Sequence, residues 1–166
     1  MRPNIDRWPA PVFSQPIRIY YEDTDAGGIV YHANYLRFME RTRTDWLRSI
    51  GVQLSQLETQ TGTVLVVRDA ALEFIAPARL DDQVSVDVRI IAMRRVSITL
   101  GQTVSLAGTS SLTTNSLTTN SSARSSGNAT LLCSGTVRIA AVDRQSGRPV
   151  AMPDKLIELI ENHGNV

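Results

Sequence analysis

The sequence has little of what most covalent and metal-dependent chemistry requires. It contains one cysteine and two histidines in 166 residues. A single cysteine, Cys133, cannot form an internal disulfide, so nothing indicates an oxidising compartment. It lies in an apolar stretch, where a buried packing role is favoured over a nucleophilic one. His32 and His163 lie far apart and no Cys or His cluster is present, so a metal cofactor is not expected.

Long apolar runs and an excess of one charge are also missing. No apolar stretch approaches the roughly 20 residues that a membrane helix needs, and the proline-rich start of the chain has no signal-peptide core. The formal net charge of +1 is too balanced to favour nucleic acid or an acidic membrane surface as a partner. We therefore expect a cytoplasmic protein with no membrane span and no nucleic-acid ligand.

The order of secondary structure indicates an α+β domain. Residues 1–15 carry repeated prolines and predict an irregular arm before a single domain over residues 16–166. Helical spacing of apolar residues predicts one long helix, with Asn34 as its N-cap and Gly51 just after its end. Period-two or β-branched patterns predict strands over residues 17–20, 64–75, 84–90, 96–106 and 136–142, and a short helix follows Pro153. This order favours an antiparallel sheet wrapped on one helix.

One segment does not fit this pattern. Residues 107–130 are almost entirely Ser, Thr, Asn and Gly, and the five-residue run Ser-Leu-Thr-Thr-Asn occurs twice in tandem over residues 111–120. Such a composition cannot bury enough apolar surface to offset the entropy of ordering, so we expect a flexible low-complexity insert between two strands that would otherwise form a hairpin. Because loop-closure entropy rises slowly with length, an expansion that the fold tolerates is favoured over a functional loop.

The densest polar and glycine-bearing segment joins the first expected strand to the long helix. It reads Tyr-Glu-Asp-Thr-Asp-Ala-Gly-Gly-Ile-Val-Tyr-His-Ala-Asn-Tyr over residues 21–35. A loop before a helix offers free backbone N–H groups and the positive end of the helix dipole, which suit a developing oxyanion. From the residues alone, Asp23 and Asp25 could equally form a turn or cap the helix, and His32 could be an ordinary surface residue.

The segment from Tyr21 to Tyr35 closely resembles the acyl-CoA thioesterases of the 4-hydroxybenzoyl-CoA thioesterase group, in particular the branch whose genes accompany the Tol–Pal cell-envelope system. The resemblance continues through residues 40–44 and 74–82, and weakly through 92–94. It implies a hotdog fold, in which a curved antiparallel sheet of about five strands wraps one long central helix. It also implies hydrolysis of an acyl-CoA with a short aliphatic or aromatic acyl group, with no cofactor, since coenzyme A is part of the substrate.

The resemblance assigns roles to individual residues. Asp25 matches the family's catalytic carboxylate, which acts as a nucleophile or as a general base for water. His32 marks the helix start, where a backbone N–H polarises the carbonyl and the His side chain is also implicated, and Tyr21 matches a further catalytic residue. The expected substrate-binding residues are Gly27, Gly28, Val30, Tyr31, Arg94 and Arg95. The two arginines would hold CoA phosphates, although a solvated charged turn explains them equally well.

The resemblance also implies assembly and partners. Hotdog domains of this kind pair through their sheets into dimers and often tetramers, with active sites at the dimer interface. An acyl carrier protein, lipid-synthesis enzymes and a peripheral position at the inner membrane are further implications. Two alternatives remain. The segment from Asp25 to His32 does not match a hydratase or dehydratase of acyl thioesters, and intact Asp25, His32 and Tyr21 argue against a purely non-catalytic scaffold.

Overall fold

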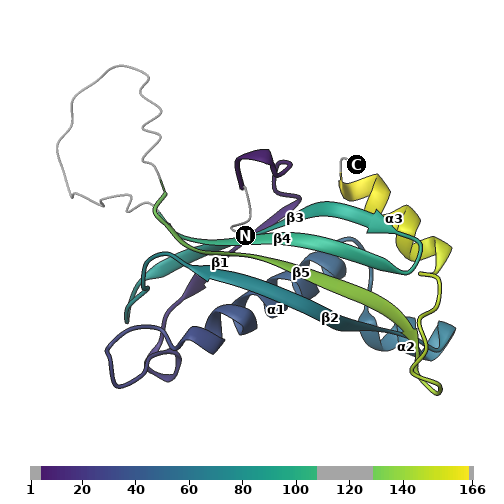
Figure 1. Cartoon of the computed structure of the whole chain (residues 1–166), viewed down its shortest axis with the longest axis horizontal. Helices are drawn as coiled ribbons and strands as arrows, with labels where there is room; N and C mark the ends of the chain where they lie inside the picture. Colours follow the sequence, from purple (N-terminus) through teal and green to yellow (C-terminus); the bar gives the residue numbers. More distant parts are fainter. Residues whose placement is uncertain (1–4, 108–128, 165–166) are drawn as a thin grey trace, which may run out of the picture.

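The computed structural model describes residues 5–107 and 129–164. In this part of the chain, a five-stranded antiparallel sheet curves over a long helix (Figure 1). The strands are β1 (Phe13–Arg18), β2 (Thr63–Phe74), β3 (Gln83–Arg94), β4 (Ser97–Leu106) and β5 (Leu131–Asp143). The helices are α1 (His32–Ser49), α2 (Leu54–Thr61) and α3 (Asp154–Gly164), with short 3-10 turns at Ile5–Arg7 and Tyr21–Asp23. The α+β hotdog architecture predicted from the sequence is confirmed.

The strand order places β1 and β2 at the two edges of the sheet. The order is β1-β3-β4-β5-β2, and all neighbouring strands are antiparallel. Irregular register within β2, between Val67 and Asp69, and within β3, between Ile90 and Ala92, increases the local twist of these long strands. β4 and β5 pair directly, as expected for the strands that flank the insert. The insert itself falls on residues 108–128, which lie outside the described residues.

α1 buries one face against the sheet, because its apolar residues recur at intervals of three and four. The buried residues of this face include Tyr35, Phe38, Met39 and Trp46. Alternate residues of β3 are buried beneath them, which is the period expected of a strand with one face on the core. No helix in the described ranges is long and apolar enough to cross a membrane.

The first strand begins earlier than the sequence predicted. β1 starts at Phe13, inside the segment expected to be irregular, and includes Pro16. Proline cannot donate a ladder hydrogen bond and is therefore confined to edge strands, which β1 is. Before β1, the ring of Trp8 lies against the backbone of Gly101 in β4, where an added Cβ would come within 2.8 Å of the ring. The prediction of an irregular arm over residues 1–15 is therefore wrong for residues 13–15, which belong to β1, while residues 8–12 form no helix or strand and residues 1–4 lie outside the described residues.

The long helix also starts before its predicted N-cap. The N-cap is Tyr31, whose side chain makes no capping hydrogen bond. The buried Asn34 lies inside the first turn, and its side chain donates to the backbone carbonyl of Asp23 at 2.9 Å. Asn34 therefore ties the preceding loop to the helix. The predicted end is confirmed: Gly51 has a φ of 89°, the left-handed conformation common just after a helix.

Candidate active site

A tight loop between β1 and α1 carries Asp25. Thr24 and Val30 form an isolated antiparallel bridge at its base. The N–H of Asp25 donates to the carbonyl of Ile29 at 3.0 Å, and the N–H of Gly28 donates to the carbonyl of Asp25 at 3.0 Å. Gly28 has a φ of 71°, which glycine adopts without steric cost. These bonds close the loop into a small hairpin with Asp25 on its exposed part.

The carboxylate of Asp25 is held by one backbone donor. The N–H of Gly27 donates to Asp25 Oδ1 at 2.7 Å. An added Cβ at Gly27 would lie 3.0 Å from that same oxygen, so glycine leaves the room that this contact needs. Within the described ranges no second hydrogen bond to the carboxylate is found. Its other oxygen is therefore available to attack a carbonyl or to accept a proton from water.

The first turn of α1 presents open backbone N–H groups beside this loop. The first N–H groups of a helix have no partner within the helix. Here the N–H of Asn34 donates to the carbonyl of Tyr31 at 2.8 Å, while those of His32 and Ala33 make no hydrogen bond to the described chain. The Thr24–Val30 bridge links the Asp25 loop to the residues that lead into this turn. Open N–H groups at the positive end of a helix dipole can stabilise an oxyanion.

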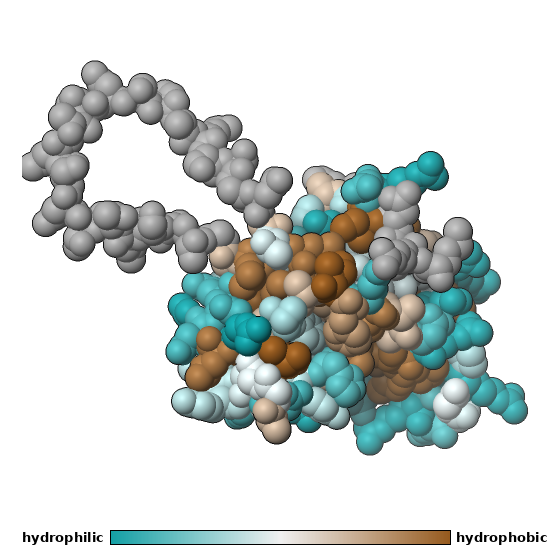
Figure 2. Space-filling model, turned by 60° about the vertical axis from the view of Figure 1, so that its left-hand side comes forward, coloured by the Kyte–Doolittle hydropathy of each residue, from teal (hydrophilic) through white to brown (hydrophobic). Residues whose placement is uncertain are grey.

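Aromatic rings and an apolar hollow adjoin the helix start. The ring of His32 lies 4.4 Å from that of Tyr31 and 6.3 Å from that of Phe74, and the ring of Tyr35 lies 5.6 Å from Phe74, all between centroids. The hollow measures about 260 Å³ and is lined by Ile29, Val30, His32, Tyr35, Phe74, Ile75, Ala76 and Pro77. Figure 2 turns this end of the molecule forward and shows brown, apolar side chains gathered beside teal, polar ones. Such a hollow next to polar donors can hold a ligand with an apolar end.

Tyr35 fixes the far wall of this hollow. Its hydroxyl accepts a hydrogen bond from the N–H of Ala78 at 2.9 Å, and burial raises the pKa of its phenol above the ordinary value. The N–H of Val30 donates in turn to the carbonyl of Ala78 at 2.9 Å. The segment after β2 is thus bound both to α1 and to the Asp25 loop. Sequence reasoning missed Tyr35 and Phe74 as site residues, although both lie in segments that carried the resemblance.

Other predicted site residues make no side-chain hydrogen bond to the Asp25 carboxylate in the described ranges. Tyr21 is 81% exposed, and its contact with the loop is made by its backbone carbonyl, which accepts from the N–H of Thr24 at 3.1 Å. Arg94 ends β3 and Arg95 follows it. β3 has 12 residues and begins at the loop end of the sheet, so at about 3.3 Å per residue the arginines lie roughly 35–40 Å along the strand from that end. A single chain does not bring them to Asp25.

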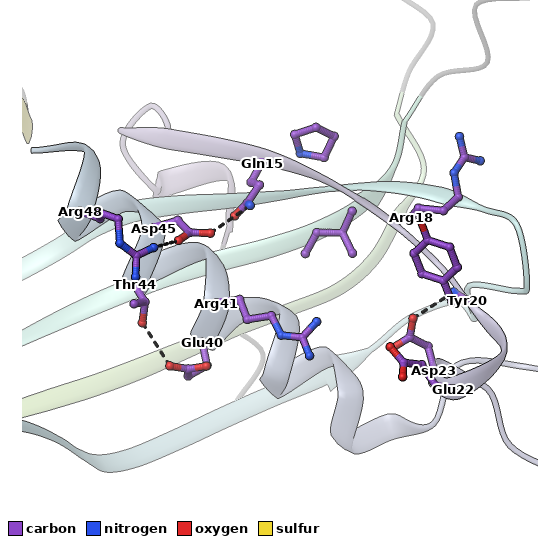
Figure 3. Close-up of a pocket in the computed structure, with 12 residues that line it drawn as sticks. Gln15, Arg18, Tyr20, Glu22, Asp23, Glu40, Arg41, Thr44, Asp45 and Arg48 are labelled. Carbon is purple, nitrogen blue, oxygen red and sulfur yellow. Dashed lines mark hydrogen bonds and ion pairs between the residues drawn. The ribbon is translucent and has the colours of Figure 1, made fainter. Parts of the chain in front are cut away.

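A larger, polar hollow of about 450 Å³ lies between β1 and α1. Figure 3 shows Arg41 of α1 extending into it, while Asp45 interacts with both Gln15 and Arg48. The charged residues of the lining are Arg18, Arg41, Arg48, Glu22, Asp23, Glu40 and Asp45. Acidic and basic groups nearly balance, so this hollow does not favour a phosphate group. Among residues 5–107 and 129–164, no group of three His, Cys, Asp or Glu side chains is placed to hold a metal ion.

Comparisons with known proteins identify the family of this chain. Residues 20–160 match the family model of the thioesterase-like superfamily. Acyl-CoA thioesterase YbgC of Haemophilus influenzae is 34% identical over 87% of this chain and 90% of its own length. Acyl-CoA thioester hydrolase YbgC of Escherichia coli O157:H7 is 36% identical over 88% of this chain and 93% of its own length.

Solved structures share the fold. A variant of 4-hydroxybenzoyl-CoA thioesterase complexed with 4-hydroxybenzoyl-CoA superposes with a TM-score of 0.72 at 21% identity, covering 88% of this chain and 96% of that one. A 1,4-dihydroxy-2-naphthoyl-CoA thioesterase from Synechocystis superposes with a TM-score of 0.72 at 19% identity, covering 89% of this chain and 94% of that one. The match to the family model and the sequence relatives together show that this chain belongs to the thioesterase-like superfamily.

Proposed function

We propose that this protein hydrolyses acyl-CoA thioesters to the free acid and CoA, with Asp25 as the catalytic carboxylate. The observation that carries the proposal is the Asp25 carboxylate, held at 2.7 Å by the N–H of Gly27 on a loop tied to the open end of α1. Sequence relatives at 34% and 36% identity are named as an acyl-CoA thioesterase and an acyl-CoA thioester hydrolase, which supports this reaction class.

The geometry supports a simple sequence of steps. The thioester carbonyl oxygen binds at the open N–H groups of His32 and Ala33, which stabilise the negative charge that develops on it. Asp25 either attacks the carbonyl carbon directly or takes a proton from the water that attacks it. In the direct route the C–S bond breaks as an anhydride forms between Asp25 and the acyl group, and water then hydrolyses this anhydride to release the acid and regenerate the carboxylate. In the general-base route the hydroxyl of water adds to the carbonyl carbon and the C–S bond then breaks. In both routes the CoA thiolate takes up the proton that water gives up. Tyr21 and the His32 side chain complete the proposed catalytic set, and the role of the Tyr21 side chain rests on the resemblance.

The apolar hollow beside α1 supports a short aliphatic or aromatic acyl group. Its volume of about 260 Å³ and its ring-bearing walls, Tyr35 and Phe74, suit a compact group that can pack edge to face. Val30 and Tyr31 lie at the same helix start, which fits their proposed role in substrate binding. Gly27 and Gly28 allow the loop backbone to approach the thioester.

We also propose that the enzyme works as a homodimer that can assemble into a homotetramer. Arg94 and Arg95 can reach CoA phosphates at the active site only if another copy brings them there, because β3 separates them from Asp25 of their own chain. A cytoplasmic location, an acyl carrier protein or lipid-synthesis partner, a position peripheral to the inner membrane and a link to the Tol–Pal system remain proposals that rest on the resemblance.

The test is thiol release from a panel of short aliphatic, long aliphatic and aromatic acyl-CoAs. We expect Asp25→Asn to lower kcat/KM by about 100-fold or more, the loss typical when a general base is removed. The matched control is Glu22→Gln, which neutralises an exposed carboxylate in the same loop that holds no hydrogen bond in the described chain. Glu22→Gln should stay within about threefold of the native protein. No hydrolysis of any panel member by the folded protein would contradict the proposal.

A further inference from the structure

Asn34 is a buried polar residue that joins the first turn of α1 to the segment before the Asp25 loop. It is 4% exposed, and its side-chain amide donates to the backbone carbonyl of Asp23 at 2.9 Å. The N–H of Tyr31, the N-cap, donates to the same carbonyl, also at 2.9 Å. Two hydrogen bonds from the helix start therefore meet on one carbonyl oxygen, which has a lone pair for each of them.

Asp23 is itself held firmly at the other end of this contact. Its own N–H donates to the carbonyl of Tyr20 at 3.0 Å, and its carboxylate Oδ2 accepts from the N–H of Tyr20 at 3.0 Å. Asp23 comes two residues before Asp25 in the sequence. Thr24, between them, forms the bridge to Val30 that closes the catalytic loop. The position of Asp23 thus fixes where the Asp25 loop starts.

The bond from Asn34 to Asp23 connects the two halves of the proposed catalytic machinery. One half is the Asp25 carboxylate, and the other is the pair of open N–H groups on His32 and Ala33, which immediately precede Asn34 in the sequence. The covalent path between the two halves runs through a loop with two adjacent glycines, which restrict the backbone little. A direct contact between the two anchors restrains their separation more tightly than this path does.

The way in which Asn34 bonds also distinguishes it from a helix cap. A capping side chain accepts a hydrogen bond from an N–H of the first turn and so occupies one of the open donors. Asn34 instead donates to a carbonyl outside the helix, and in the described chain its side chain makes no bond to an N–H of α1. It therefore holds the first turn in place and leaves the N–H groups of His32 and Ala33 available for an oxyanion.

We infer that Asn34 is a positioning residue for the reaction: through the Asp23 carbonyl, its amide fixes the separation between the Asp25 carboxylate and the open N–H groups of α1. These groups act on the carbon and the oxygen of one thioester carbonyl, so an error in their separation is felt most in the transition state. Binding of the acyl group in the apolar hollow is affected less. This inference rests on the proposed function and adds a residue that touches neither substrate nor water.

The experiment measures kcat and KM for thiol release, together with thermal unfolding, in the native protein, Asn34→Ala and Asn34→Asp. We expect both variants to lower kcat by about 10- to 100-fold, the loss typical of a small misplacement of reacting groups, and to raise KM by less than about threefold. Asn34→Asp keeps the shape of the side chain but turns its donor into an acceptor that repels the Asp23 carbonyl. A negative charge is favourable in the first turn of a helix, so this variant decides the question even where Asn34→Ala does not fold.

Gln102→Ala is the matched control. Gln102 of β4 is buried, and its side-chain amide donates to the carbonyl of Met39 at 2.9 Å, which ties α1 to the sheet farther along the helix. Its removal should lower the Tm about as much as Asn34→Ala does and leave kcat within about threefold of native. This comparison separates the positioning of the helix start from the general stability of α1.

Three results would overturn the inference: native kcat in a folded Asn34 variant, a raised KM at native kcat, or an equal fall of kcat in Asn34→Ala and Gln102→Ala. Each of these leaves the proposed function intact, provided that the native protein hydrolyses an acyl-CoA and Asp25→Asn does not. A native protein that hydrolyses no member of the panel would overturn both.

Discussion

At the scale of single residues, the site depends on how the backbone aims one carboxylate. Gly27 positions the Asp25 carboxylate in two ways. Its N–H donates to Oδ1 at 2.7 Å, and because it has no Cβ, no side-chain atom crowds that oxygen. The orientation of the Asp25 carboxylate therefore depends on Gly27. A substitution at Gly27 should affect the reaction even though it removes no chemical group.

We expect Gly27→Ala to lower kcat by about 10- to 100-fold, because the new methyl group would lie 3.0 Å from Asp25 Oδ1 and small misplacements of a reacting group carry penalties of this size. KM should rise by a smaller factor than kcat falls, since the apolar hollow and the start of α1 are untouched and only the approach of the loop backbone to the thioester is hindered. The measurement is steady-state kinetics on the best acyl-CoA of the panel, with thermal unfolding as the control for folding. Native kcat in Gly27→Ala would show that the contact with Asp25 does not position the carboxylate.

Cys133, in contrast to Asp25, carries a reactive group that the fold makes unreactive. It is buried, and desolvation together with the charge of Glu73 raises the pKa of its thiol to about 12. Because the folded-state pKa is raised, the thiol contributes stability that is fully present below the unfolded-state pKa of about 8.5 and is lost as pH rises toward 12.

Two measurements test this description of Cys133. In the native protein, the thiol should react with a disulfide reagent at least about 100-fold more slowly than in denaturant, because the thiolate is the reactive form. Between pH 8 and pH 10, the free energy of unfolding should fall more in the native protein than in Cys133→Ala. Equal falls in both proteins would rule out the thiol as the titrating group.

At the scale of elements, the packing of the N-terminal segment on the sheet rests on one glycine. Trp8 lies against Gly101 of β4, where a Cβ would come within 2.8 Å of the ring. We expect Gly101→Val to lower the free energy of unfolding by about 1–3 kcal/mol, the usual cost of overpacking. Denaturant unfolding measures it. The double variant Trp8→Ala/Gly101→Val should lose less than the sum of the two single variants, since both remove the same contact; additive losses would mean that the two residues do not interact.

Elements with a strong local pattern were predictable from the sequence, and their ends were not. The alternation in β3 and the helical spacing in α1 each follow from one buried face, so periodicity located both. The start of β1 was missed because Pro16 excludes a central strand but tolerates an edge strand, and edge position is a property of the whole sheet. The sequence predicts Asn34 as the N-cap because its side-chain oxygen can accept a hydrogen bond from a helix N–H group. In the structure that amide bonds Asp23, a tertiary contact that no local pattern encodes.

One part of the candidate site could also be predicted from the sequence and another part could not. The Asp25 loop and the helix start lie in one continuous segment, so the resemblance could place them. The opposite wall of the hollow, at Phe74 and the residues after it, comes from a distant strand end. Tyr35 binds that wall through Ala78, 43 residues away in the sequence. Such a contact depends on how β2 crosses over α1, which only the assembled fold determines.

At the scale of the whole molecule, two observations support the proposed homodimer. In the described chain β2 pairs only with β5, so its other edge is uncovered, and Val66 and Val67 of this strand are exposed. Arg94 and Arg95 lie a full strand length from their own Asp25. A second copy of the chain would account for both observations. It would cover the free edge of β2 and bring its own Arg94 and Arg95 to an active site that they cannot reach within one chain.

The join between β4 and β5 supports a last prediction, that the insert is dispensable for the fold. The strands on either side remain paired up to the point where it leaves them, since the N–H of Leu106 donates to the carbonyl of Thr130 at 2.8 Å. Replacing residues 108–128 with an Asn-Gly turn would close the hairpin directly. Because a shorter loop costs less closure entropy, we expect the free energy of unfolding to rise by about 1–2 kcal/mol, measured by denaturant unfolding. Thiol release should stay within about threefold of native, because the Asp25 loop and the start of α1 keep all their described contacts. A loss of activity at unchanged stability would instead show that the insert takes part in the reaction.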